Sequence, residues 1–171
     1  ELQKLGIISK QAKEWEETVT KLNNIKEITP QVPAKTFLGD LRSYQQDGLS
    51  WLYFLRSYNL GGILADDMGL GKTVQTISFF TLLPKRERQG KPFLVVAPTS
   101  VVENWDGELE RFAPSLNKVI FRRGDRKEAH NQLQKADVVL ISYSLLVRDF
   151  EKLKAVQFDT IFLDEAQMAK N

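Results

Sequence analysis

The chain has 171 residues, of which 42% are hydrophobic and 27% charged, a balance that suits one domain with a substantial apolar core. No apolar run is long enough to span a membrane and the first residues lack a signal-peptide pattern, while the absence of cysteine excludes disulfides and the single His130 disfavours a zinc site. A net charge of +2 is too small to indicate nucleic acid as a partner by itself, and we expect a cytoplasmic protein without membrane contact.

The first part of the chain predicts a helix and a linker. Four apolar residues recur at helical spacing within residues 9–28: Ala12, Trp15, Val19 and Leu22. This helix either packs on the protein's own domains or binds a partner. Residues 29–35 contain two prolines and are typical of a linker. We therefore divide the chain into an N-terminal extension, residues 1–36, and a domain, residues 37–171.

Helical and strand patterns alternate through the rest of the chain. Helices are predicted at 43–58, 72–83, 100–112, 125–135 and 145–154, and strands at 62–65, 93–97, 118–122, 137–141 and 158–163. Ser100 and Glu103 predict a capping box, and Asp125 predicts an N-cap. The charged loop 85–92 is expected to be mobile. Because several strands are continuous Val/Ile/Leu runs, the pattern predicts an α/β fold with a parallel sheet covered on both faces.

The most informative segment lies between strand 62–65 and helix 72–83. It contains Asp66, Asp67, Met68, Gly69, Leu70, Gly71, Lys72 and Thr73, and is called the phosphate loop below. A strand, a glycine turn and a helix in this order place backbone N–H groups and a lysine around one anion. Asp66 stands where a strict motif has glycine, although the flanking elements supply the required context. We expect this loop to bind a polyphosphate.

A second motif, Asp164-Glu165-Ala166-Gln167, directly follows strand 158–163. A phosphate loop needs a carboxylate that coordinates magnesium and another that activates water in order to cleave ATP. We expect Lys72 to contact the β- and γ-phosphates, Thr73 and Asp164 to hold Mg²⁺, and Glu165 to act as base. Asp66 and Asp67 either orient the loop and sense Mg²⁺, or stabilise its turn. The two motifs together predict a nucleotide-driven motor.

These motifs fall in an order that resembles superfamily II helicase-like ATPases. The matching segments are Leu41-Arg42-Ser43-Tyr44-Gln45, the phosphate loop, residues 95–100 with Trp105, and Asp164 to Gln167. Residues 37–171 closely resemble the first RecA-like lobe of Swi/Snf-type DNA translocases, and the forms of the two catalytic motifs favour a bacterial member. The resemblance implies a P-loop RecA-like fold that is incomplete at the C-terminus. In similar proteins the next strand lies between the phosphate-loop strand and the strand before the Asp-Glu pair.

The resemblance also implies roles for single residues. Gln45 would recognise adenine, and Gln167 would couple nucleotide state to a second lobe unless it is a plain helix-start residue. The nucleotide would further contact Asp67, Met68, Gly69, Leu70, Gly71, Lys72 and Thr73.

Double-stranded DNA is the partner that the resemblance implies. Its backbone would lie on residues 98–100 and on Ser142 and Tyr143, for which ordinary helix caps are the alternative. A basic cluster offers further contacts, although solvated loop charge is the simpler explanation: Arg122, Arg123, Arg126 and Lys127, with Lys85, Arg86 and Arg88. Trp51 and Trp105 lie on apolar helix faces and are assigned to the core.

We therefore expect one lobe of a double-stranded-DNA-dependent ATPase and translocase of Swi/Snf type. The second RecA-like lobe would supply an arginine finger, so the chain alone should have little or no activity. The alternatives are a nucleotide-switch module that binds ATP without hydrolysing it, and another superfamily II helicase or restriction-type translocase.

Overall fold

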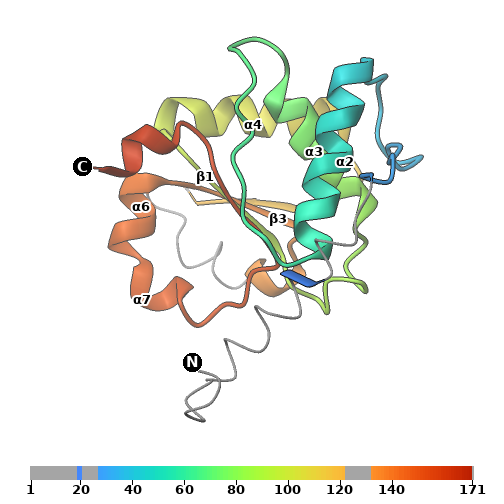
Figure 1. Cartoon of the computed structure of the whole chain (residues 1–171). Helices are drawn as coiled ribbons and strands as arrows, with labels where there is room; N and C mark the ends of the chain where they lie inside the picture. Colours follow the sequence, from blue (N-terminus) through green and yellow to red (C-terminus); the bar gives the residue numbers. More distant parts are fainter. Residues whose placement is uncertain (1–18, 21–26, 122–131, 171) are drawn as a thin grey trace, which may run out of the picture.

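A computed structural model describes residues 19–20, 27–121 and 132–170. At its centre lies a parallel sheet with the strand order β2-β3-β1-β4 (Figure 1). The strands are β1 (Phe93–Ala97), β2 (Lys118–Ile120), β3 (Val138–Ser142) and β4 (Ile161–Leu163). The predicted α/β fold with a parallel sheet is therefore confirmed.

Helices cover both faces of this sheet. They are α2 (Ser43–Ser57), α3 (Lys72–Leu82), α4 (Thr99–Phe112), α6 (Tyr143–Arg148) and α7 (Phe150–Leu153), with 3₁₀ turns at Leu133–Lys135 and Ala166–Lys170. Since successive strand residues point to opposite faces, β1 contributes to two apolar clusters. Phe93 and Val95 pack with residues of α2, α3 and α4, whereas Leu94 and Val96 pack with residues of α6 and α7. No helix in the described ranges is long and apolar enough to cross a bilayer.

The predicted strand over residues 62–65 is wrong. These residues form neither a helix nor a strand, and the side chain of Ile63 is 84% exposed. A strand needs a neighbour with which it can exchange backbone hydrogen bonds. The strand pairings of the described sheet join β1, β2, β3 and β4, and none of them includes residues 62–65.

Several helices and strands begin or end at other residues than predicted, and some of these differences have a local cause. α4 begins at Thr99 with Pro98 as its N-cap, so the capping box predicted from Ser100 is wrong. The single helix predicted over 145–154 is instead α6 and α7, separated at Asp149. α6 begins early because the Ser142 hydroxyl accepts a hydrogen bond from the Leu145 N–H at 3.4 Å. β3 begins and ends one residue later than predicted, and β4 begins at Ile161 rather than at residue 158.

Two predicted helices fall mainly outside the described residues. Of the helix over 9–28, only residues 19–20 (helical) and 27–28 are described. Of the helix over 125–135, including its cap Asp125, the described end is a 3₁₀ turn. Residues 29–35 carry no helix or strand, as a linker requires. The domain boundary at 36/37 stays a prediction.

The loop 85–92 differs from its prediction at Arg88, which is buried with 1% exposure. Its guanidinium forms an ion pair with Asp137 at 2.8 Å and lies 4.3 Å from the centre of the Phe93 ring. Its Nε also donates to the Leu83 carbonyl at 2.8 Å. Arg88 is therefore neither a solvated charge nor part of a basic surface cluster, because it anchors the loop to the core.

Candidate functional site

The predicted site residues gather at the carboxyl edge of the sheet. β1, β3 and β4 are parallel, so the residues that follow them, Pro98, Tyr143 and Asp164, emerge at this edge. α3 has 11 residues and so spans about 16 Å. The chain that follows α3 reaches Arg88, which pairs with Asp137 directly before β3, at the amino edge of the sheet. The N-terminus of α3 and the phosphate loop therefore lie at the carboxyl edge (Figure 1). Ligands of open α/β sheets bind at this edge.

The phosphate loop has the backbone that an anion site requires. Gly69 and Gly71 have φ angles of 86° and 80°, a region that glycine adopts readily. The first backbone bond of α3 runs from the Gln75 N–H to the Gly71 carbonyl at 3.0 Å. The N–H groups of residues 71–74 thus have no acceptor within the helix, and they can bind phosphate oxygens.

The side chain of Lys72 binds to backbone carbonyls within the phosphate loop. Its ammonium group donates to the carbonyl oxygens of Asp66 at 2.6 Å and of Asp67 at 3.1 Å. A bound phosphate would compete with these carbonyls for the same charge. Thr73, the next residue, is half-buried and its hydroxyl bonds to no described residue, so it is available to a magnesium ion. Lys72, Thr73 and the free amides therefore fit Mg-ATP.

Gln45 fastens the beginning of α2 to the phosphate loop. Its Oε1 accepts from the Arg42 N–H at 2.9 Å, and its Nε2 donates to the Leu70 carbonyl at 3.1 Å. A Cβ atom on Gly71 would lie 2.6 Å from this Nε2, so the close approach requires glycine there. Adenine recognition by Gln45 stays a prediction, and it would use amide atoms that contact the protein here.

Gln75 is a loop-positioning residue that the sequence analysis missed. It is fully buried on α3, and its Nε2 donates to the Asp66 carboxylate at 2.8 Å. The carboxylate of Asp66 thus ties the loop to the helix, which supports the turn-stabilising interpretation of that residue. Its position one helical turn after Gly71 is the signal that could have identified it. Asp67 and Met68 are exposed, with Met68 at 91%.

Asp164 is held by four hydrogen bonds. The Trp105 indole N–H donates to Oδ2 at 2.8 Å, and the Glu165 N–H donates to Oδ1 at 3.0 Å. The Tyr143 hydroxyl donates to the Asp164 carbonyl at 2.8 Å, and the Asp164 N–H donates to the Val96 carbonyl at 2.9 Å. Trp105 is a core residue as predicted, with 4% exposure, but its polar N–H contact was missed.

Tyr143 stays a hydrogen-bond donor in this environment. Burial, followed by the negative charges of Asp164 and Glu165, raises the pKa of its hydroxyl above the ordinary value. A raised pKa keeps the proton in place at neutral pH, and the contact to the Asp164 carbonyl needs that proton.

The backbone changes direction at Glu165, two residues after the end of β4. The φ angle of Glu165 is 50°, a left-handed conformation that is uncommon for a residue with a side chain and that concentrates at functional sites. The exposed carboxylate accepts a hydrogen bond from the Gln167 side chain. Within the described residues, no hydrogen bond or ion pair joins Asp164 or Glu165 to Lys72 or Thr73, although all four residues belong to the carboxyl edge of the sheet.

The predicted DNA contacts divide into two groups. Thr99 and Ser100 are exposed at the beginning of α4. Ser142 is only 3% exposed and its hydroxyl caps α6, which supports the helix-cap interpretation, and the Tyr143 hydroxyl is bonded to Asp164. The predicted cluster at residues 122–127 lies outside the described residues.

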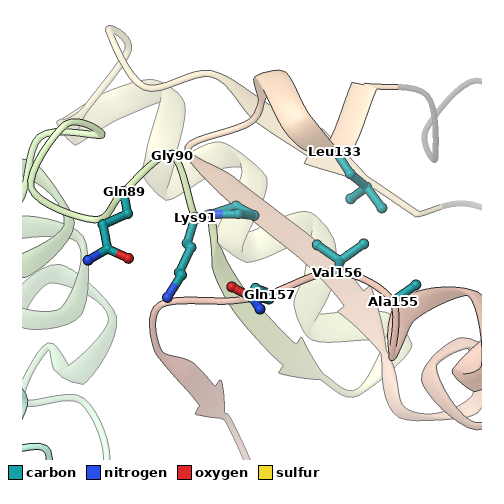
Figure 2. A pocket seen from close by; sticks show the side chains of 8 residues that line it. Gln89, Gly90, Lys91, Leu133, Ala155, Val156 and Gln157 are labelled. Atoms are coloured by element: carbon teal, nitrogen blue, oxygen red, sulfur yellow. The ribbon is translucent and has the colours of Figure 1, made fainter.

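A cavity of about 320 Å³ lies at the opposite, amino edge of the sheet (Figure 2). Pro92, which directly precedes β1, lines it together with Gln89, Gly90, Lys91, Leu133, Ala155, Val156 and Gln157. None of the predicted nucleotide residues borders this cavity, so it is separate from the candidate site.

Comparisons with known proteins agree with the predicted fold. A structure of the Sulfolobus solfataricus SWI2/SNF2 ATPase core in complex with dsDNA matches with a TM-score of 0.75 and 40% identity, over 84% of this chain and 29% of that chain. The same core domain in a second structure matches with a TM-score of 0.71 and 40% identity, over 82% of this chain and 28% of that chain. The RecA-like, P-loop fold is therefore confirmed.

Relatives at the sequence level come from bacteria and yeasts. The chain is 43% identical to the putative ATP-dependent helicase/translocase YwqA of Bacillus subtilis, over 97% of this chain and 18% of that protein. It is 39% identical to the chromatin structure-remodeling complex subunit snf21 of Schizosaccharomyces pombe, over 87% of this chain and 13% of that protein. The chain thus spans less than a fifth of either relative. Since the family model of the SNF2-related domain matches residues 44–171, the chain belongs to that family.

Proposed function

We propose that this chain is the ATP-binding first lobe of a protein that hydrolyses Mg-ATP when double-stranded DNA is bound. The observation that carries this proposal is the shared edge of the sheet, where the amides at the beginning of α3 and Lys72 lie with the anchored carboxylate of Asp164. A phosphate-binding backbone and a metal-binding carboxylate are the two parts that nucleotide hydrolysis requires.

Each residue has a defined task in this proposal. Lys72 and the N–H groups of residues 71–74 bind the phosphates, while the Thr73 hydroxyl and Asp164 hold the magnesium ion. The ion offsets negative charge on the phosphates when it is bound. Glu165 orients and deprotonates the attacking water, and its contact with Gln167 sets the direction of its carboxylate.

The proposed activity also requires double-stranded DNA and a second lobe. A DNA-bound SWI2/SNF2 core is among the structures that match this fold, and translocase is part of the name of the Bacillus subtilis relative. In this chain Thr99 and Ser100 are exposed at the carboxyl edge, where hydroxyl and N–H groups can hold DNA phosphates. A second lobe supplies the arginine finger. We place the protein in the cytoplasm of a bacterium.

A nucleotide switch without hydrolysis is the competing function. The presence of Lys72, Asp164 and Glu165, with Asp164 firmly held, argues against it, because a module that only binds ATP does not need a base for water. Other superfamily II helicases and restriction-type translocases would use the same site but a different polymer.

The test is ATP hydrolysis by the full-length protein with and without double-stranded DNA, beside the 171-residue chain. We expect strong stimulation by DNA in the full-length protein and little or no turnover in the shorter chain. Tight Mg-ATP binding without any response to DNA would contradict the motor and favour the switch.

Glu165→Gln tests the assignment of the base in the full-length protein. The amide keeps the shape of the side chain but cannot accept a proton, so turnover should fall by about 10²–10⁴-fold while ATP binding is retained. Binding is measured by calorimetry and turnover by phosphate release. Unchanged turnover would remove Glu165 from this role.

A further inference from the structure

We propose that Trp105 and Tyr143 are positioning residues that hold the Asp164 carboxylate in the geometry needed to bind a divalent cation. This inference rests on the proposed function, because it assigns the support of a metal ligand in that site. Neither residue would touch nucleotide or metal. Each would act through Asp164.

Asp164 needs support because of its place in the sheet. It follows β4, a strand of three residues at the sheet edge that has β1 as its one partner among the described strands. The side chains of Ile161 and Leu163 are 56% and 51% exposed, so the strand itself is poorly packed. A ligand at the end of such a strand would move unless other elements fixed it.

Two helices supply this support from opposite faces of the sheet. Trp105 lies on α4 and belongs to the cluster on the α2, α3 and α4 face, where its ring is 6.4 Å from that of Phe80. Tyr143 begins α6 and packs against the cluster on the other face. One fixes the Asp164 carboxylate and the other fixes its backbone carbonyl, both at 2.8 Å. The residue is thus held from both sides.

The chemistry of the donors suits a metal ligand. The indole N–H is a neutral donor that accepts nothing, so it does not compete with the carboxylate for a cation. Each carboxylate oxygen accepts one protein hydrogen bond, from Trp105 to Oδ2 and from Glu165 to Oδ1, and keeps a further lone pair. Partners that orient a metal ligand in this way commonly contribute 10- to 100-fold to metal affinity.

Trp105→Phe in the full-length protein tests the inference, because phenylalanine keeps an aromatic ring in the core and removes the donor together with part of the indole volume, a loss that the Trp51→Phe control shares. ATP binding is measured by calorimetry in EDTA and at increasing MgCl₂. We expect the half-saturating Mg²⁺ concentration to rise about 10-fold, with metal-free ATP binding unchanged. Tyr143→Phe should shift it in the same direction by a smaller factor, because its contact is to the backbone.

Trp51→Phe is the matched control. Trp51 is half-buried on α2, and its indole N–H makes no hydrogen bond within the described part of the chain. If the Trp105 contact merely satisfies a buried donor, the variants at Trp105 and Trp51 will show the same Mg²⁺ dependence as the wild type, which would overturn the inference. Since wild-type binding of Mg-ATP is measured in the same series, its absence would instead overturn the proposed function itself.

Discussion

Arg88 brings a positive charge into the core, where few side chains can compensate it. It is 1% exposed and its main partner is Asp137, whose side chain is 15% exposed. Arg88→Met keeps the apolar length but leaves the Asp137 carboxylate without its cation. We expect the free energy of unfolding, measured in urea, to fall by about 3 kcal/mol.

Arg86→Met is the control for this prediction, because Arg86 lies in the same loop and is exposed. Its effect should stay within about 0.5 kcal/mol, as is usual for surface substitutions. Equal effects of the two substitutions would mean that the loop charge, rather than the buried pair, stabilises the fold.

For single residues, the sequence predicts the local role of a side chain better than its contacts with distant parts of the chain. Lys72 and Thr73 were assigned correctly to the beginning of a helix because glycine, lysine and threonine act through local backbone geometry. The sequence predicts that Trp105 fills the core, and that Arg88 is either a solvated loop charge or part of a DNA-contacting basic cluster. Their decisive contacts, to Asp164 and Asp137, lie 59 and 49 residues away, and no local pattern encodes such distances.

Packing between α2 and α3 depends on a glycine in the middle of α2. A Cβ atom at Gly48 would lie 1.8 Å from Oε1 of Gln75, a fully buried side chain that also holds Asp66. Gly48→Ala should therefore destabilise the fold by about 1–3 kcal/mol despite the better helix propensity of alanine. Because Gln75 must move, the loop contact to Asp66 should weaken, and ATP affinity should fall with stability.

Gly107→Ala should stabilise the fold, whereas Gly48→Ala should destabilise it. Gly107 lies within α4, is exposed, and has no atom within 4 Å of an added Cβ. Alanine should stabilise this helix by about 0.5–1 kcal/mol. Thermal and urea unfolding of both variants check the pair, and a stabilising Gly48→Ala would refute the packing argument.

Elements were predictable where their signals are local. β1 and the helices α2 and α3 agree with the sequence to within one residue, because a continuous apolar run, a serine, glycines and a proline mark their ends. The strand over residues 62–65 failed for a different reason. Its apolar pattern is real, but a strand exists only when another strand pairs with it, and pairing is decided elsewhere in the chain.

For the whole molecule, the alternation of elements was sufficient to predict a parallel sheet with helices on both faces. The order β2-β3-β1-β4 was not predicted, because it depends on which strands meet after long crossovers. Because β4 lies at the edge of the described sheet, Asp164 has one neighbouring strand, whose Val96 carbonyl accepts from its N–H, and side chains from α4 and α6 add two further contacts. The fold was thus predictable from the sequence, whereas the strand order and the contacts that hold Asp164 were not.

The ion pair of Arg56 and Asp159 connects the end of α2 to the segment before β4, 103 residues apart in the chain. Burial disfavours the charge of Asp159, but hydrogen bonds from Arg56 and Thr160 outweigh it and hold the pKa below the ordinary value. The folded state therefore binds this proton less readily than the unfolded state. The stabilisation is present above the unfolded pKa of about 3.9 and is lost as the pH falls through the lower folded pKa.

Arg56→Leu reverses this pH dependence. The carboxylate of Asp159, only 6% exposed, would lose its cation, so burial would then raise its pKa and protonation would relieve the penalty. We expect the difference in unfolding free energy between wild type and variant to be largest near pH 7, and to shrink as the pH falls through the raised pKa of the variant and then through the lowered pKa of the wild type. As a control, Lys154→Leu breaks the exposed pair with Glu151 and should change stability little at any pH. A difference between wild type and Arg56→Leu that is constant from pH 7 to pH 3 would show that Arg56 stabilises the fold by packing and not through the charge of Asp159.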